Sequence, residues 1–167
     1  MNCYKFNRAN KKDVLAYIIA VLEQALINAK KAADQARATA THSENSAENK
    51  YDTLGLEAAY LAHGQSKRAQ KCLQELNEFK KFSNLDQAED QAICTGCIVT
   101  LSIENKNKIV FIGPGAAGLI VPIDGIEIVV ITPSAPLGNR LIGKHLFDEI
   151  EIVIGEIKAR YEITSCY

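Results

Sequence analysis

The chain contains no proline before Pro114, so about its first two thirds lack this residue. Proline interrupts the hydrogen bonding of helices and of central strands, so its absence removes the strongest barrier to long regular elements. Residues 12 to 82 are instead rich in Ala, Leu, Gln, Lys and Glu, which are good helix formers. We expect long helices in this part of the chain.

The chain has a formal net charge of only -1 and contains no long apolar run. The 19 basic and 20 acidic residues nearly cancel, so no global field favours a nucleic acid or a membrane surface. No apolar run reaches the roughly 18 residues needed to cross a bilayer. The opening MNCYKFNRANKKDV lacks the apolar core and cleavage site of an export signal, and we expect a cytoplasmic protein.

The cysteines do not complete a metal motif. They are Cys3, Cys72, Cys94, Cys97 and Cys166. An odd number without an export signal argues against a disulfide framework. Only Cys94-Thr95-Gly96-Cys97 has a suggestive spacing, and a zinc site needs about four ligands. No second such pair follows, and the three histidines are far apart (His42, His63, His145). We interpret Cys94 and Cys97 as structural thiols, with metal or redox work as the alternative.

Two runs in the first half repeat apolar or small residues in alternating steps of three and four, which is typical of a coiled coil. The first run contains Leu15, Ile18, Leu22, Ala25, Ala29, Ala32 and Ala36. The second contains Leu54, Ala58, Leu61, Gln65, Ala69, Cys72, Leu76 and Phe79. With only a short polar segment between them, the two helices should fold back as an antiparallel hairpin, with large residues, including Leu73, at the base. Periodicity alone also allows a dimerising coiled coil or a generic bundle, whereas an intramolecular hairpin predicts a monomer.

The second half changes to short β-rich runs. They are CIVTLSI, KIVFIG, IEIVVIT, EIEIVIG and ARYEITS. Between them we expect a hairpin turn at residues 104–108, a loop at GPGAAG and a tight turn at IDG. GPGAAG lacks the lysine and hydroxyl pair of a phosphate-binding loop, so a connection between strands is the better interpretation. One short helix is expected at PLGNRLIG, from Pro136 to Gly143. The predicted fold class is α+β, with a helical hairpin followed by a small, mostly antiparallel β domain.

Residues 129 to 152, VVITPSAPLGNRLIGKHLFDEIEI, resemble the C-terminal signature of bacterial Gre-type transcript cleavage factors. The shared features are Pro136-Leu137, Leu141-Ile142-Gly143-Lys144, Asp148 and the alternating strand that follows, with a closing strand at Tyr161-Glu162-Ile163. Gly96 lies where that family usually has a glycine before its first β strand. The helical hairpin extends the resemblance to about residues 12 to 167.

The resemblance implies an N-terminal coiled-coil hairpin at residues 1–83 with a tip at about 40–53, a linker at 84–90 and an FKBP-like domain at 91–167. It implies a factor that binds RNA polymerase, with the β domain at the rim of the secondary channel and the hairpin inside it. Such a factor is not an enzyme by itself. The family's docking loop falls on Ser134, Ala135, Pro136 and Leu137, where the usual acid-Ser-Pro is replaced by Ser-Ala-Pro.

The expected tip carries Glu44, Glu48 and Asp52 at steps of four. By the resemblance, Glu48 and Asp52, with Glu44 less favoured, would hold a Mg²⁺ ion shared with the polymerase and stimulate cleavage of backtracked RNA. The family's Asp and Glu three residues apart are not restored in any register, because Thr41, Asn45 or Asn49 occupies the Asp position. An inhibitor that enters the channel without cleavage is therefore the alternative.

Other residues of the hairpin have predicted contacts as well. Asn49, Lys50 and Tyr51 are candidates for contacts with the polymerase or the RNA. Basic residues on the arms would either track RNA phosphates or form an exposed face that keeps the rod soluble. These are Lys30, Lys31, Arg37, Lys67, Arg68 and Lys71.

Overall fold

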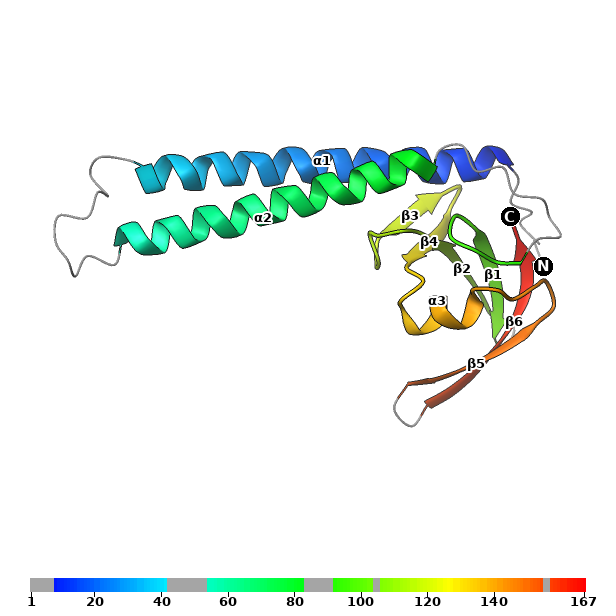
Figure 1. Cartoon of the computed structure of the whole chain (residues 1–167). Helices are drawn as coiled ribbons and strands as arrows, with labels where there is room; N and C mark the ends of the chain where they lie inside the picture. The colour runs from blue at the N-terminus through cyan, green and yellow to red at the C-terminus, as the bar shows by residue number, and fades with distance from the viewer. Residues whose placement is uncertain (1–7, 42–53, 83–91, 104–105, 155–156) are drawn as a thin grey trace. The chain divides into compact units, whose positions relative to one another are not determined.

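A computed structural model describes residues 8–41, 54–82, 92–103, 106–154 and 157–167 (Figure 1). The two long helices are α1 (Arg8–Thr41) and α2 (Leu54–Lys81). The rest of the order is β1 (Ile98–Ile103), β2 (Lys106–Ile112), β3 (Ile120–Ile123), β4 (Ile126–Ile131), α3 (Pro136–Leu141), β5 (Glu149–Ile154) and β6 (Ile157–Cys166). The predicted α+β class is confirmed.

The chain forms two compact units. The first combines Met1–Ile18 with Glu78–Tyr167, and the second consists of Ile19–Asn77. Both long helices therefore contribute residues to both units. The linear limits predicted from the sequence, 1–83, 84–90 and 91–167, stay a prediction.

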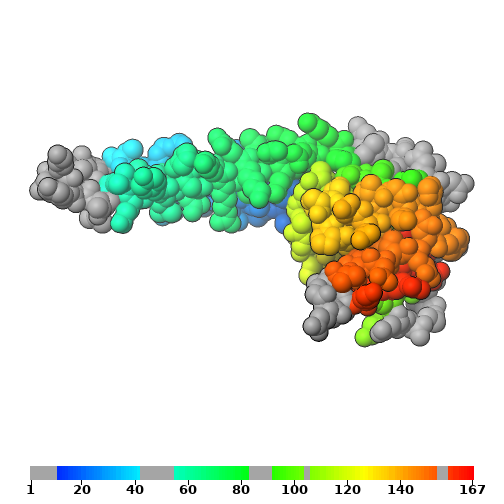
Figure 2. Space-filling view, turned by 60° about the horizontal axis from the view of Figure 1, so that its bottom comes forward, coloured from blue at the N-terminus to red at the C-terminus, as the bar shows by residue number. Residues whose placement is uncertain are grey.

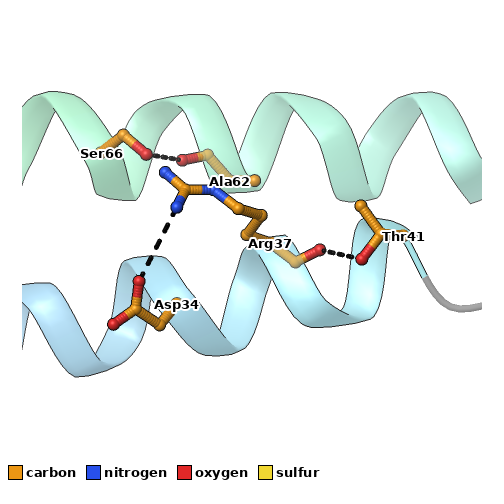
Figure 3. A network of polar contacts seen from close by, with 5 residues as sticks. All are labelled: Asp34, Arg37, Thr41, Ala62 and Ser66. Atoms are coloured by element: carbon orange, nitrogen blue, oxygen red, sulfur yellow. Dashed lines mark hydrogen bonds and ion pairs between the residues drawn. The ribbon is translucent and has the colours of Figure 1, made fainter.

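The second unit is the hairpin, in which α1 and α2 lie side by side and antiparallel (Figures 1 and 3). The face that α1 buries carries Leu22, Leu26, Ala29, Ala33 and Ala36. The predicted positions Ala25 and Ala32 are only half-buried. Leu22, Ala29 and Ala36 keep the predicted repeat, and the apolar stripe of this helix is wider than a strict seam, so that Leu26 and Ala33 lie deeper than the predicted residues beside them.

On α2 the prediction was wrong at two leucines. Leu61 is 56% exposed and Leu73 is 41% exposed, whereas Ala62 is half-buried and Leu76 is buried. One row of half-buried or buried positions on this helix follows steps of three and four: Gly55, Ala58, Ala62, Gln65, Ala69, Cys72, Leu76 and Phe79. Ser66, Glu75 and Glu78 are half-buried beside this row. The step from Ala58 to the next inward position is thus four residues, to Ala62, and not three, to Leu61.

The sheet of the first unit has the strand order β3-β4-β2-β1-β6-β5. Four neighbouring pairs are antiparallel, and β2 with β4 is parallel. The predicted, mostly antiparallel domain is thus confirmed. The β1–β2 connection is shorter than predicted, because β2 already begins at Lys106. The predicted tight turn joins β3 to β4, where Asp124 and Gly125 both have positive φ (51° and 79°), as a two-residue hairpin turn requires.

The GPGAAG segment is a loop between strands, as predicted. It connects β2 to β3, and Gly118 has φ 88°. The sequence analysis did not predict β3, which contains Pro122. This strand lies at one edge of the sheet, where proline is tolerated because no neighbouring strand needs its missing N–H.

The first four residues of β1 and the last three of β2 are buried on both faces of the sheet. On one face Cys97, Val99, Leu101, Val110 and Ile112 belong to the core cluster, which Leu141 of α3 completes. On the other face the Phe111 ring stacks on Phe79, with ring centroids 6.3 Å apart. The last turns of α2 thus complete the core of the first unit.

Candidate functional site

The loop before α3 is a tight, proline-flanked turn. The Ala135 N–H donates to the Thr132 carbonyl at 3.0 Å, and the hydroxyls of Thr132 and Ser134 are 3.0 Å apart. Ala135 is the N-cap residue in extended conformation, and Pro136 occupies the first helical turn, where a missing N–H costs nothing. The local sequence therefore fixes where α3 starts.

Gly138 allows the backbone of α3 to lie directly against the backbone of this loop. A Cβ at this position would overlap the Thr132 carbonyl oxygen and lie 2.9 Å from its carbon and 3.3 Å from Pro133 Cα. These are backbone atoms that cannot rotate away. Gly138 thus permits a close contact between helix and loop that no larger residue allows.

The four residues of the predicted docking loop face different surroundings. Ser134 and Pro136 are exposed, Ala135 is half-buried, and Leu137 packs against the core cluster of its own domain. Its role toward a polymerase stays a prediction. Figure 2 shows α3 and the segment leading to β5 together at one surface of this unit.

The segment after α3 presents apolar side chains that the sequence analysis missed. Gly143 has φ 80°, and its N–H donates to the Ile93 carbonyl at 2.8 Å. On its two sides, Ile142 before it and Leu146 and Phe147 after it are exposed by 39%, 41% and 71%. The sequence does contain a signal for this surface. These apolar residues flank a turn glycine and follow neither the period of a strand nor that of a helix, so no predicted core accommodates them.

Asp148, part of the resemblance, has a local structural role. Its carboxylate accepts the His145 N–H at 2.9 Å, and the Asp148 N–H donates to the His145 carbonyl at 3.1 Å. Phe147, between them, has φ 69° and donates its N–H to the Ile163 carbonyl. Asp148 therefore stabilises a turn in which a phenylalanine is held outward.

The arms of the hairpin carry an exposed basic surface. The six predicted basic residues are all exposed, namely Lys30, Lys31, Arg37, Lys67, Arg68 and Lys71. Arg37 pairs with Asp34 at 3.9 Å, and both side chains are largely in solvent, so the pair contributes little stability (Figure 3). Hydroxyls of Thr41 and Ser66 donate to carbonyls one turn earlier in their own helices (Figure 3). The cationic side chains are thus available to an anionic partner.

The predicted tip residues lie outside the described residues. These are Glu44, Glu48, Asn49, Lys50, Tyr51 and Asp52. In the chain they connect Thr41, the last residue of α1, with Leu54, the first of α2. Among the residues that the structure does describe, no group of three or more His, Cys, Asp or Glu is suited to hold a metal ion.

Cys94 and Cys97 form a compact turn before β1. The Cys97 N–H donates to the Cys94 carbonyl and the Cys94 N–H to Cys97 Sγ, both at 3.2 Å. Gly96, with φ 99°, closes this turn. The sequence pair is thus a real spatial pair, and the structure adds Cys166, which packs against the same core cluster as Cys97.

Within the described ranges, no helix is both long enough and apolar enough to cross a membrane. A scan against protein-family models gives no match, and a search of the curated proteins gives none either.

Solved structures to which this chain is similar are transcription factors. The GreA factor homolog 1 (Gfh1) protein of Thermus thermophilus is 17% identical, with a TM-score of 0.38 over 89% of this chain and 94% of that chain. Gfh1 of Thermus aquaticus is 15% identical, with a TM-score of 0.39 over 89% and 92%. The elongation factor GreA/GreB from Nitrosomonas europaea is 18% identical, with a TM-score of 0.36 over 66% and 93%.

Proposed function

We propose that this protein is a Gre-like transcription elongation factor that binds RNA polymerase through its secondary channel and modulates elongation. The observation that carries the proposal is the two-helix arm, whose connection at residues 42–53 holds three carboxylates. A two-helix rod has the slender form needed to enter a channel. The signature at residues 129–152, with its loop and short α3, supports the same proposal.

In this proposal the chain is an accessory factor, and the polymerase supplies the reaction centre. Glu48 and Asp52 offer oxygen ligands, the type that Mg²⁺ prefers, and would hold the ion together with the polymerase. Such an ion, when bound, activates water in a two-metal displacement of RNA. The carboxylates of this chain would deliver and orient that site, while Asn49, Lys50 and Tyr51 contact the surrounding polymerase or RNA.

The exposed arm residues would guide the extruded RNA. Lys67, Arg68 and Lys71 are exposed on α2, and Lys30 and Lys31 are exposed on α1. Lysine and arginine side chains neutralise phosphates and release counterions, so their contribution weakens as salt rises. A fall in activity with salt that disappears when these charges are removed would support this role.

The test is transcript length after the purified protein is added to a backtracked elongation complex with its cognate RNA polymerase and Mg²⁺. Shortened RNA that can be re-extended indicates a cleavage factor. The double variant Glu48→Ala and Asp52→Ala should abolish shortening while polymerase binding stays nearly intact. Glu57→Ala is the matched control, because Glu57 is an exposed carboxylate in the first turn of α2 and should be neutral.

A second function is favoured by one feature of the sequence. The Asp that Gre factors have three residues before the tip Glu is absent, since Asn45 or Thr41 stands there when Glu48 or Glu44 is aligned. A rod without this residue would occupy the channel and obstruct nucleotide addition. Slower extension of unshortened RNA would identify such an inhibitor, and cleavage would exclude it.

A further inference from the structure

Three cysteines gather against one core cluster around the start of β1, in a place that the proposed function does not use. Cys97 is 2% exposed and belongs to the core cluster, and Cys94 and Cys166 are half-buried and pack against the same cluster. Cys94 reaches this place through the tight turn that places its N–H 3.2 Å from Cys97 Sγ. The turn alone would give a simple pair of thiols.

A β-bulge brings in the third cysteine. Leu101 pairs with Ile163 and Val99 pairs with Cys166, so between these pairs two residues of β6 lie opposite one residue of β1. The extra residue is accommodated at Thr164, whose hydroxyl donates to the Thr100 carbonyl at 3.2 Å. Side chains alternate along a regular strand, so residues three apart would face opposite sides. The bulge instead turns Cys166 to the face of Ile163, which is also the face of Cys97.

The contacts within the cluster shift the pKa values of Cys97 and Cys166 in opposite directions. The Cys166 S–H donates to Cys97 Sγ, and this hydrogen bond lowers the pKa of Cys97 and raises that of Cys166. The Cys94 N–H and the positive charge of Lys11 also favour the Cys97 thiolate, whereas burial opposes it. One sulfur is thus prepared as a nucleophile beside a neighbour that keeps its proton.

We propose that Cys97 and Cys166 form a peroxide-reactive dithiol site that closes into a disulfide. The Cys97 thiolate attacks one oxygen of hydrogen peroxide, the O–O bond breaks, and Cys97 sulfenic acid and hydroxide form. The Cys166 sulfur then attacks the Cys97 sulfur, the S–O bond breaks, and the Cys166 proton leaves with the hydroxyl as water. Two thiols are oxidised by two electrons, and one peroxide is reduced to two waters when the hydroxide takes up the proton of Cys97.

The burial of the cluster selects a small oxidant. Cys97 is almost fully buried, and Cys94 and Cys166 of the same cluster are half-buried, so a peroxide molecule reaches it more readily than a bulky disulfide does. A metal does not provide a better occupant, because the described residues contain no group of three or more ligands with suitable geometry. The closed disulfide would join the turn before β1 to the end of β6.

The test uses the full chain, treated with hydrogen peroxide, with the remaining thiols alkylated before digestion. Trypsin cuts after Lys81, Lys106 and Arg160, so the proposed disulfide joins peptide 82–106 to peptide 161–167. Fragment ions of the joined peptide should place the link at Cys97. The joined peptide should be lost in Cys166→Ser, in which a trapping reagent should instead detect Cys97 sulfenic acid, and kept in Cys72→Ser, because Cys72 lies on α2.

Peptide 161–167 recovered fully alkylated from the treated wild type would overturn the proposal. A link confined to Cys94 and Cys97 would overturn it too, since that link leaves peptide 161–167 free. Because the peptide map of the wild type decides both outcomes, the result does not depend on whether a cysteine variant folds.

Discussion

Gly138 and Gly64 are both helical glycines, and the structure predicts opposite effects when each is changed to alanine. In Gly138→Ala the new methyl group meets the backbone of Thr132 and Pro133, which cannot move without breaking the turn before α3. Overpacking of this kind costs typically about 1–3 kcal/mol. Alanine also favours helices over glycine by about 1 kcal/mol, which offsets part of the cost.

The net expectation for Gly138→Ala is a loss of up to about 2 kcal/mol in the free energy of unfolding of the first unit. In Gly64→Ala nothing lies within 4 Å of the new Cβ, and Gly64 is exposed on α2. The hairpin should therefore gain about 0.5–1 kcal/mol.

Urea unfolding followed by circular dichroism, with the total tyrosine fluorescence as a second probe, measures both changes. The two probes matter because hairpin and β domain need not unfold in one step. A Gly138→Ala protein as stable as the wild type would refute the close contact between α3 and its loop. A Gly64→Ala protein that loses stability would show that α2 is packed on a side that the structure leaves open.

Three further predictions concern single side chains. In thermal unfolding, Phe79→Ala should lower the free energy of unfolding by about 3–5 kcal/mol, because the ring is fully buried and stacks on Phe111. Leu73→Ala, at a position that is 41% exposed, should change the stability little and is the control. Gln65→Leu should raise the melting temperature, because among the described residues Gln65 Oε1 is a buried atom without a hydrogen-bond partner. An unsatisfied buried polar atom costs about 1–3 kcal/mol of stability. A lower melting temperature would contradict this prediction. The alkylation rate of Cys97 should rise with pH around a pKa of about 6, which is lowered from 9.0 chiefly by the Cys166 hydrogen bond, and should fall below that pH as the thiolate is protonated. Cys166→Ala should move the midpoint of this pH dependence upward. An unchanged midpoint would refute the role of Cys166.

The sequence predicted element types well because periodicity is a strong local signal. Leu22, Ala29 and Ala36 are buried on α1 as expected. The exact face of α2 was less predictable, since Leu61 and Ala62 are both apolar and only the partner helix decides which of them turns inward. Local patterns also carry no information about which strands become neighbours, so the parallel pairing of β2 with β4 was not predicted.

The site was predictable only in part, for reasons of distance along the chain. Cys94 and Cys97 are close in sequence, so their pairing was visible, but Cys166 joins them through a bulge that depends on strand register. Likewise Leu137 belonged to the predicted docking loop, yet its packing against the core follows from where α3 lies on the sheet. Contacts between distant residues need the fold before they can be seen.

The order of the segments that make up the first unit determines how the length of the two-helix arm, the hairpin of α1 and α2, can be changed. Residues 19–77 form an insertion between two segments that together make the first unit, in which Val14, Ile18 and Phe79 are buried. Adding a heptad to each helix within that insertion would lengthen the arm by about 10 Å and leave the core of the first unit unchanged. Cutting the chain in front of the sheet, in contrast, would strip Phe111 of the ring that covers it. The reach of the arm is thus an adjustable property, whereas its attachment is not.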